Sequence, residues 1–183
     1  NIQLLSIQTC RLDILVVLAE INGLNLEVLA RRSDIILLAI PVNHALELLP
    51  LVLDQIGPEA VVLDFGSTKL KISQKANSCA NRGQFVACHP IAGTENTGPS
   101  AAFATLFAGK INIICDREKS SAFALERAEA LIEALGMTNK YMNSREHDRH
   151  IAYVSQMSHV SSFILGQTVL EVEKNEQNIF DMA

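Results

Sequence analysis

Short runs rich in β-branched residues alternate with longer segments of helical periodicity along most of the chain. Residues 35–42, Ile-Ile-Leu-Leu-Ala-Ile-Pro-Val, form the clearest run. A continuous apolar stretch ended by Pro is typical of a strand buried on both faces of a parallel sheet. Similar runs predict strands at 60–64, 84–88 and 110–115, and residues 139–142 are compatible with a short last strand.

Helical periodicity fills the intervals between these strands. In residues 44–56, apolar side chains recur every third or fourth position, and Gly57 ends the pattern. The same reasoning predicts a helix at 70–80, a short one at 101–106 and an amphipathic one at 121–135. Strands that alternate with helices predict an α/β fold with a doubly wound, mostly parallel sheet.

Residues 144–171 form one long helical pattern of a different character, less charged and rich in Ser, Ala, Val and His. This change predicts an α/β domain over 1–143, followed at 144–183 by the start of an all-helical domain. The chain begins at Asn1 rather than Met and stops directly after an apolar helical pattern with no capping signal. We therefore expect the sequence to be incomplete.

Composition excludes several classes of protein. Only 5% of residues are aromatic and the net charge is -5, with no cluster of Lys and Arg, so a nucleic-acid binder is not expected. The apolar runs are too short to span a bilayer. The four cysteines, Cys10, Cys79, Cys88 and Cys115, form no CxxC pair and follow no secretory signal. We interpret them as reduced thiols of a cytoplasmic protein and expect no metal site.

Candidate ligand-binding segments stand at the ends of three successive predicted strands. These segments are Ala39 to Val42, Asp64 to Lys69 and His89 to Glu95. In open α/β sheets, ligands bind outside the carboxyl ends of the strands. The three segments are therefore expected to converge on one crevice.

His89 is the best single candidate for chemistry. The following Pro90 holds it in extended backbone, which at a strand end aims the imidazole at the crevice. An imidazole suits proton transfer near neutral pH. The competing interpretation is a histidine that caps the next turn, but Gly93, Thr94 and Glu95 add a flexible turn and two polar groups, which favours function.

Gly66 and Ser67 form the second candidate. Glycine permits close approach of the backbone, and the Ser67 hydroxyl could donate to a substrate or cofactor. Taken alone, these residues are better explained by an ordinary Ser or Thr N-cap of the next helix.

The long helix adds further polar candidates. His147 and His150 share a helix face, but no third ligand has the spacing of a metal site, so a structural role for at least one is expected. Gln156 and His159 lie among apolar residues and indicate either a polar pocket wall or a solvated helix face.

In order and spacing, these motifs resemble the prephenate dehydrogenases. The matching segments are Gly66-Ser67-Thr68-Lys69, His89-Pro90-Ile91-Ala92-Gly93-Thr94-Glu95, Glu146-His147-Asp148, and Ser155-Gln156-Met157-Ser158-His159. The resemblance covers about residues 31–183, and the segment His89 to Glu95 is highly specific. It implies a Rossmann-type domain over 1–143, followed by the helical dimerisation domain of a homodimer. It also implies oxidative decarboxylation of prephenate to 4-hydroxyphenylpyruvate, with NAD as the expected cofactor and NADP possible.

The resemblance implies a role for each candidate residue. His89 would hydrogen-bond the ring hydroxyl of prephenate and take up its proton. Ser67 would sit between that hydroxyl and the nicotinamide. The other candidates would surround these two, with the substrate contacted by Thr94, Glu95, Gln156 and His159, and the cofactor by Ala39, Pro41, Gly66 and Ser67.

Three features depart from the family pattern. Residues 1–30 contain one glycine, Gly23, and no GxGxxG turn for the cofactor phosphates, and we expect that turn to be missing from the sequence at hand. Gln156 and Ser158 stand where many members have His and Pro. The chain also ends before the arginine that binds the substrate carboxylate. Arogenate and aminodeoxy-prephenate dehydrogenases, and a non-catalytic ligand-binding relative, are therefore the competing interpretations.

Overall fold

The structure of the protein, a computed structural model, describes residues 4–8, 13–17, 30–93 and 103–172, with the backbone alone at 4–8 and 13–17. The chain divides into two compact units, Asn1–His147 and Asp148–Ala183. The first unit is built on a β-sheet, and the described part of the second is helical.

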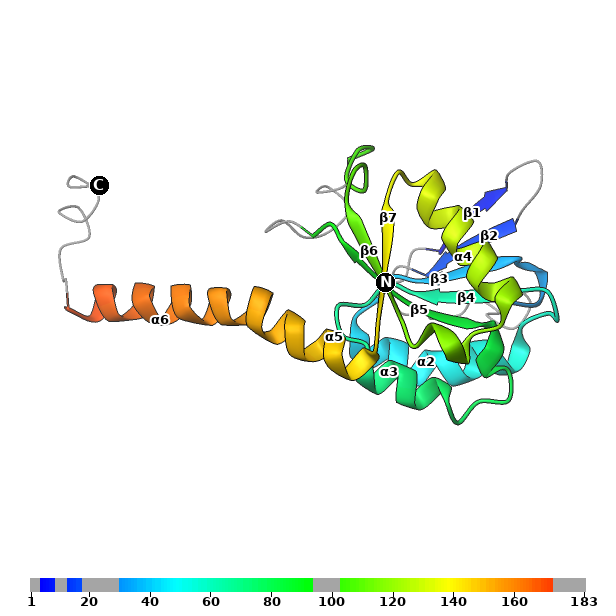
Figure 1. Cartoon of the computed structure of the whole chain (residues 1–183), viewed down its shortest axis with the longest axis horizontal. Coiled ribbons are helices and arrows are strands. Elements are labelled where there is room, and N and C mark those ends of the chain that lie inside the picture. Colours follow the sequence, from blue (N-terminus) through cyan, green and yellow to red (C-terminus); the bar gives the residue numbers. More distant parts are fainter. Residues whose placement is uncertain (1–3, 9–12, 18–29, 94–102, 173–183) are drawn as a thin grey trace. The chain divides into compact units, whose positions relative to one another are not determined.

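In the described part of the chain, seven strands form one sheet and lie side by side in chain order (Figure 1). Strands β2 to β5 are parallel neighbours, and so are β6 and β7. Strand β1 pairs antiparallel with β2, and β6 pairs antiparallel with β5. The mostly parallel sheet predicted from the sequence is confirmed. The strands are β1 (Leu4–Gln8), β2 (Asp13–Val17), β3 (Ile35–Leu38), β4 (Val61–Asp64), β5 (Phe85–Ile91), β6 (Ile111–Cys115) and β7 (Thr138–Met142).

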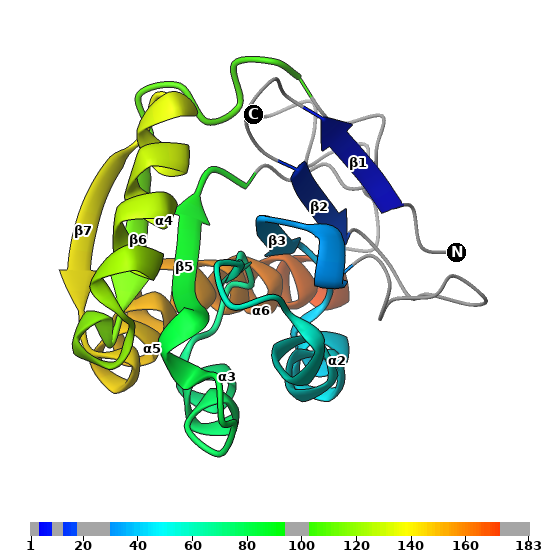
Figure 2. The same cartoon turned by 90° about the vertical axis from the view of Figure 1, so that its right-hand side faces the viewer.

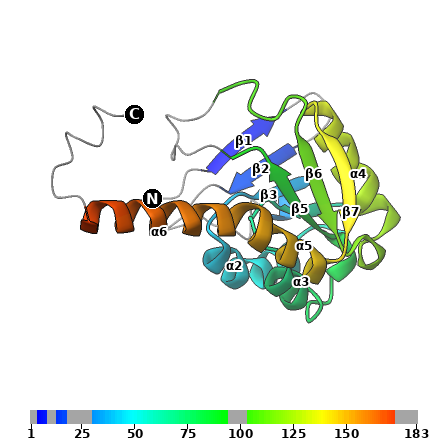
Figure 3. The same ribbon diagram turned by 60° about the vertical axis from the view of Figure 1, so that its left-hand side comes forward.

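Helices cover both faces of this sheet. Helices α2 (Val42–Gln55) and α3 (Leu70–Ala76) lie on one face, and α4 (Ala122–Ala134) lies on the other (Figures 2 and 3). Helix α4 begins at an N-cap, where the Ser121 side chain accepts a hydrogen bond from the Ala124 amide. The predicted layering of helix, sheet and helix is thus observed.

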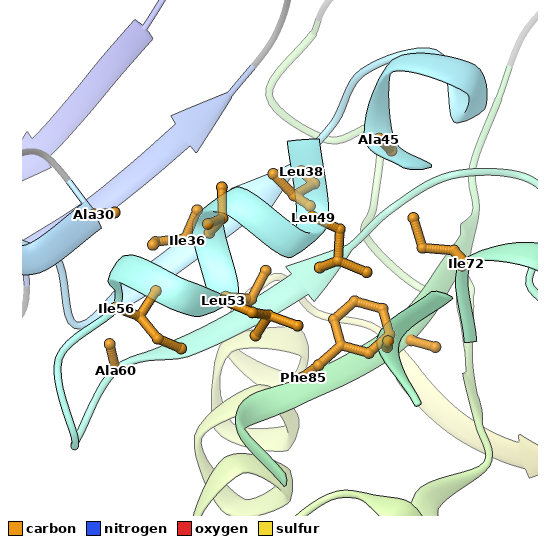
Figure 4. Packing of buried hydrophobic residues seen from close by; sticks show 14 of the residues in the cluster. Ala30, Ile36, Leu38, Ala45, Leu49, Leu53, Ile56, Ala60, Ile72 and Phe85 are labelled. Atoms are coloured by element: carbon orange, nitrogen blue, oxygen red, sulfur yellow. The ribbon is translucent and has the colours of Figure 1, made fainter. Parts of the chain in front are cut away.

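The central strands bury side chains on both faces. Ile36 and Leu38 of β3 pack in the cluster that joins the sheet to α2 and α3 (Figure 4). The alternate residues Ile35 and Leu37 pack in a second cluster with Ala124 of α4. Because successive side chains of a strand point to opposite faces, a strand covered on both sides must be apolar throughout. This explains the continuous apolar runs in the sequence.

The predicted helix at 101–106 is wrong for its described residues, 103–106. Residues 103–109 form successive turns closed by three-residue hydrogen bonds, from Leu106 N to Phe103 O and from Lys110 N to Phe107 O. None of their side chains is buried. A short helix without an apolar face to pack is marginal in water, which explains the turns.

The second unit continues the helical pattern of the sequence. Helix α5 (Ser144–Ile151) bridges the two units, and a π-helical turn (Ala152–Gln156) leads into α6 (Met157–Val172). Several apolar side chains of α6 are exposed, including Phe163 at 79% and Leu165 at 67%. None of the described helices is both long enough and apolar enough to cross a membrane.

Candidate active site

The carboxyl ends of β3, β4 and β5 lie side by side, so the segments that follow them share one edge of the sheet. Leu38 pairs with Asp64, and Asp64 pairs with Ala87, each at the end of the parallel ladder. The Phe65 amide donates to the Leu38 carbonyl at 2.9 Å and ties the turn after β4 to the end of β3. Segments that are far apart in the sequence are therefore neighbours at this edge.

A buried ion pair shapes the turn between β4 and α3. Asp64 and Lys69 are 1% and 0% exposed, and the Lys69 ammonium is paired with the Asp64 carboxylate. The ammonium also donates to the Cys88 carbonyl at 2.7 Å, and Asp64 Oδ1 accepts from the Gly66 amide at 3.1 Å. Buried charges are tolerated when hydrogen bonds satisfy them in this way. The result is a fixed path for residues 65–68.

Gly66 lets this turn lie close to the start of α2. A Cβ at Gly66 would stand 3.1 Å from Asp64 Oδ1 and 3.2 Å from Val42 Cγ2, tighter than ordinary contact. Packing alone therefore explains why position 66 is a glycine, whether or not a ligand binds there.

Ser67 is exposed at the edge of the sheet. The residue that caps α3 is Lys69, and this helix start carries no side-chain capping bond. The N-cap interpretation of Ser67 is therefore not supported.

His89 lies within β5, two residues beyond Ala87, where pairing with β4 stops. The sequence predicted that this strand ends at Cys88. It continues to Ile91 because β6 pairs antiparallel with it, with His89 opposite Ile113. His89 is half-buried in extended backbone at the predicted sheet edge.

The imidazole of His147 lies against that of His89. The His89 Nδ1 and His147 Nε2 atoms are 2.9 Å apart, and the rings meet edge to face with centroids 5.0 Å apart. His147 has no exposed surface, whereas His150, three residues on, is exposed. The pair that the sequence placed on one helix face is therefore split, and only His147 joins the site.

Helix α5 is held at this edge by β6. The Asp116 carboxylate, directly after β6, accepts a hydrogen bond of 2.8 Å from the Ser144 amide at the first residue of α5. Asp116 adopts a left-handed backbone with φ of 50°, which aspartate tolerates better than most residues. This cap sets the position of His147, one turn further along α5.

Sequence reasoning placed Asp64 and Lys69 in a segment at this edge without a role for either, and it expected a structural role for at least one of His147 and His150. A signal for His147 was available, because Ser144 and His147 are the buried positions of an otherwise charged α5. A lysine five residues after an aspartate gives no comparable signal, since such pairs are usually solvated.

The remaining predicted residues are distributed as follows. Ala39 is half-buried and Pro41 is exposed, both between β3 and α2. Thr94 and Glu95 lie outside the described residues. Gln156 and His159 belong to the helical unit, and their roles stay predictions.

The buried thiol at the site is not a nucleophile. Burial raises the pKa of Cys88 to about 12, although the nearby Lys69 cation opposes the shift. Cys88 therefore stays protonated at neutral pH and serves as a packing residue. Within the described ranges, no three His, Cys, Asp or Glu side chains are grouped as metal ligands.

Known proteins share this architecture. The crystal structure of Aquifex aeolicus prephenate dehydrogenase in complex with hydroxyphenyl propionate and NAD+ superposes with a TM-score of 0.71 at 27% identity, covering 82% of this chain and 51% of that one. Synechocystis arogenate dehydrogenase gives a TM-score of 0.69 at 25% identity, covering 86% and 57%. The fold is therefore that of a Rossmann-type α/β domain.

The sequence comparison gives the family. Residues 19–140 match the family model of the prephenate dehydrogenase nucleotide-binding domain. The chain is also 31% identical over 155 residues to Bacillus subtilis prephenate dehydrogenase, covering 84% of this chain and 41% of that protein. The chain belongs to the prephenate dehydrogenase family. It spans about half the length of the curated relatives it matches.

Proposed function

We propose that this protein oxidatively decarboxylates prephenate to 4-hydroxyphenylpyruvate, with NAD+ as the hydride acceptor. The observation that carries the proposal is the position of His89, at the edge of the sheet where β4 also delivers the turn with Ser67. Ligands of open α/β sheets bind at this edge.

The reaction needs little from the protein beyond orientation and proton handling. Hydride leaves ring carbon 4 and CO2 leaves carbon 1, and the gain of an aromatic ring drives both losses. His89 accepts the proton of the ring hydroxyl and returns it to the phenol oxygen of the product, so the proton count balances. A general base of this kind contributes on the order of 10²–10⁴-fold to the rate.

The residues present fit a nicotinamide nucleotide at this edge. When bound, NAD+ would supply the acceptor for the hydride. Ala39 and Pro41 follow β3 and Ser67 follows β4 at this edge, and none of the three has a bulky side chain. Ala39, Pro41, Gly66 and Ser67 would hold the nicotinamide end, and Ser67 would orient the ring hydroxyl. Thr94, Glu95, Gln156 and His159 would contact the substrate.

A direct assay tests the proposal. Formation of NADH from NAD+ and prephenate is measured for the protein at its natural length and for His89→Asn. The variant is expected to lose on the order of 10²-fold or more in kcat, with NAD+ affinity unchanged. Undiminished turnover by His89→Asn would overturn the role of His89.

Arogenate is the competing substrate, because one structural relative is an arogenate dehydrogenase at 25% identity. Arogenate and aminodeoxy-prephenate would undergo the same ring chemistry and differ from prephenate in other groups. Parallel kcat/KM measurements on the three compounds, with NAD+ and with NADP+, decide the substrate and the cofactor.

A non-catalytic binding protein is the second competing function, since residues 1–30 contain one glycine and no phosphate-binding turn. Calorimetric titration with NADH, together with the turnover assay, distinguishes the enzyme from the non-catalytic binding protein. Binding of NADH together with turnover supports the enzyme, whereas an absence of both favours the binding protein.

The expected partner of the helical unit is a second copy of the protein. Exposed apolar side chains on α6, such as Phe163, Ile164 and Leu165, need a cover, and contiguous apolar surface usually marks an interface. Sedimentation equilibrium tests this expectation, and a single species of monomer mass contradicts it.

We place the reaction in the cytoplasm. The described cysteines, Cys79, Cys88 and Cys115, are free thiols, which suits a reducing compartment. Recovery of the protein outside the cytoplasm in a cell fractionation would contradict this placement.

A further inference from the structure

The contact between His89 and His147 limits which nitrogen of His89 can act as a base. At 2.9 Å, the His89 Nδ1 and His147 Nε2 atoms are within hydrogen-bond distance. A neutral imidazole carries one N–H and one lone pair. One of the two rings must therefore donate to the other.

The two possible arrangements have opposite consequences for catalysis. If His147 donates from Nε2, neutral His89 carries its hydrogen on its own Nε2 and cannot accept a proton there. If His89 donates from Nδ1, its Nε2 keeps a lone pair. Only the second arrangement lets His89 take a proton from a substrate at Nε2.

We propose that His147 is a positioning residue whose Nε2 accepts a hydrogen bond from His89 Nδ1 and thereby keeps the base form of His89 at Nε2. The inference rests on the proposed function, because it concerns the same proton transfer. In that step, the substrate O–H bond breaks and its proton bonds to His89 Nε2. The resulting imidazolium still donates from Nδ1 to the lone pair of His147, as a stronger, charge-assisted hydrogen bond.

The surroundings of His147 suit an orienting role. It has no exposed surface, so it does not contact solvent or a ligand directly. Its helix is capped by Asp116 at the end of β6, and β6 is also the strand that pairs with His89. The ring planes lie at 70° to each other, and the closest approach between polar atoms joins His89 Nδ1 to His147 Nε2.

Kinetics of three variants test the proposal. His147→Gln keeps an acceptor at about the reach of Nε2, whereas His147→Leu keeps the volume and removes the acceptor. His150→Leu, on the same helix but exposed, is the matched control. We expect kcat to fall on the order of 10–10²-fold in His147→Leu, to recover at least partly in His147→Gln, and to stay unchanged in His150→Leu. KM for prephenate is expected to change little.

Equal kcat loss in His147→Gln and His147→Leu, with thermal unfolding temperatures unchanged, would overturn the proposal. So would a loss confined to KM. If His147→Leu fails to fold, the position of the hydrogen on the His89 ring of the wild-type protein still decides, because the proposal requires it on Nδ1 and a merely structural role of His147 does not.

Nitrogen-15 NMR of the histidine rings reports which nitrogen of His89 carries the hydrogen. In the wild-type protein, we expect hydrogen on His89 Nδ1 and a lone pair on Nε2, and in His147→Leu a shift toward the other tautomer. Hydrogen on His89 Nε2 in the wild type would overturn the proposal. This spectrum needs no turnover, so a protein inactive on every substrate would refute the proposed function and leave the tautomer test standing.

Discussion

Lys69 donates a hydrogen bond of 2.7 Å from its ammonium to the carbonyl oxygen of Cys88, the residue that precedes His89. The same ammonium is paired with Asp64 at the end of β4. One buried cation thus joins the turn that carries Ser67 to the strand that carries His89. The relative position of the two candidate residues therefore depends on a side chain that need not contact a ligand.

Removal of this cation should destabilise the fold strongly. Lys69→Met leaves the Asp64 carboxylate buried and unpaired, which costs about 3–5 kcal/mol in comparable cases. Urea denaturation measures the loss of unfolding free energy. The control is Lys71→Met, two residues on and exposed, for which we expect a change within about 0.5 kcal/mol.

The double variant Asp64→Leu/Lys69→Met distinguishes pairing from packing. Since the unpaired charge is gone, it should be more stable than Lys69→Met. An unfolding midpoint for Lys69→Met equal to that of the wild type would show that the Asp64–Lys69 ion pair contributes nothing to stability.

Gly66→Ala should destabilise the protein by about 1–3 kcal/mol, because the added methyl group would crowd Asp64 and Val42. Gly83→Ala is the matched control, since a Cβ there meets nothing nearer than 3.8 Å. Thermal unfolding of both variants checks the difference. Equal transition temperatures would contradict the close packing of the two turns.

Ser67→Ala should separate catalysis from stability. Its side chain is exposed, so unfolding free energy should change by less than about 0.5 kcal/mol. Loss of one orienting hydrogen bond should lower kcat on the order of 10-fold. Thr68→Val, also exposed and adjacent, should keep full turnover, and a loss in that variant equal to that of Ser67→Ala would contradict a specific role.

The Cys88 thiol should make stability fall at alkaline pH. In the unfolded chain, the thiol ionises near its ordinary pKa of 9.0, whereas burial raises the folded pKa to about 12. Above pH 9, the unfolded chain therefore releases a proton that the folded protein keeps, and stability declines until about pH 12. Below pH 9, this thiol adds no pH dependence.

The measurement is the difference in unfolding free energy between wild type and Cys88→Val across this range. As pH rises from 9, the unfolding free energy of the wild type should fall relative to that of Cys88→Val, because valine does not ionise. A constant difference would contradict the raised pKa.

Much of the sheet was predictable, because strands covered on both faces must be apolar throughout. Residues 35–38 and 61–63 satisfy that rule, and the one departure in these two strands is Asp64 at the end of β4. The strands β1 and β2 were not predicted, since residues 9–12 between them, Thr-Cys-Arg-Leu, contain no Gly or Pro that would mark a turn. The missed extension of β5 to Ile91 depends on pairing with β6, which is a nonlocal contact.

The candidate site was predictable only in part, for a related reason. The positions of Ser67 after β4 and of His89 after the buried residues of β5 follow from local sequence and the parallel arrangement. The contact of His89 with His147 joins residues 58 positions apart, and no periodicity encodes it. Lys69 likewise finds its second partner, the Cys88 carbonyl, 19 residues away.

Strand β6 positions both imidazoles. It pairs with the backbone at His89, and the Asp116 carboxylate directly after it caps the helix that carries His147. The spacing of the rings is therefore decided wholly inside the first unit.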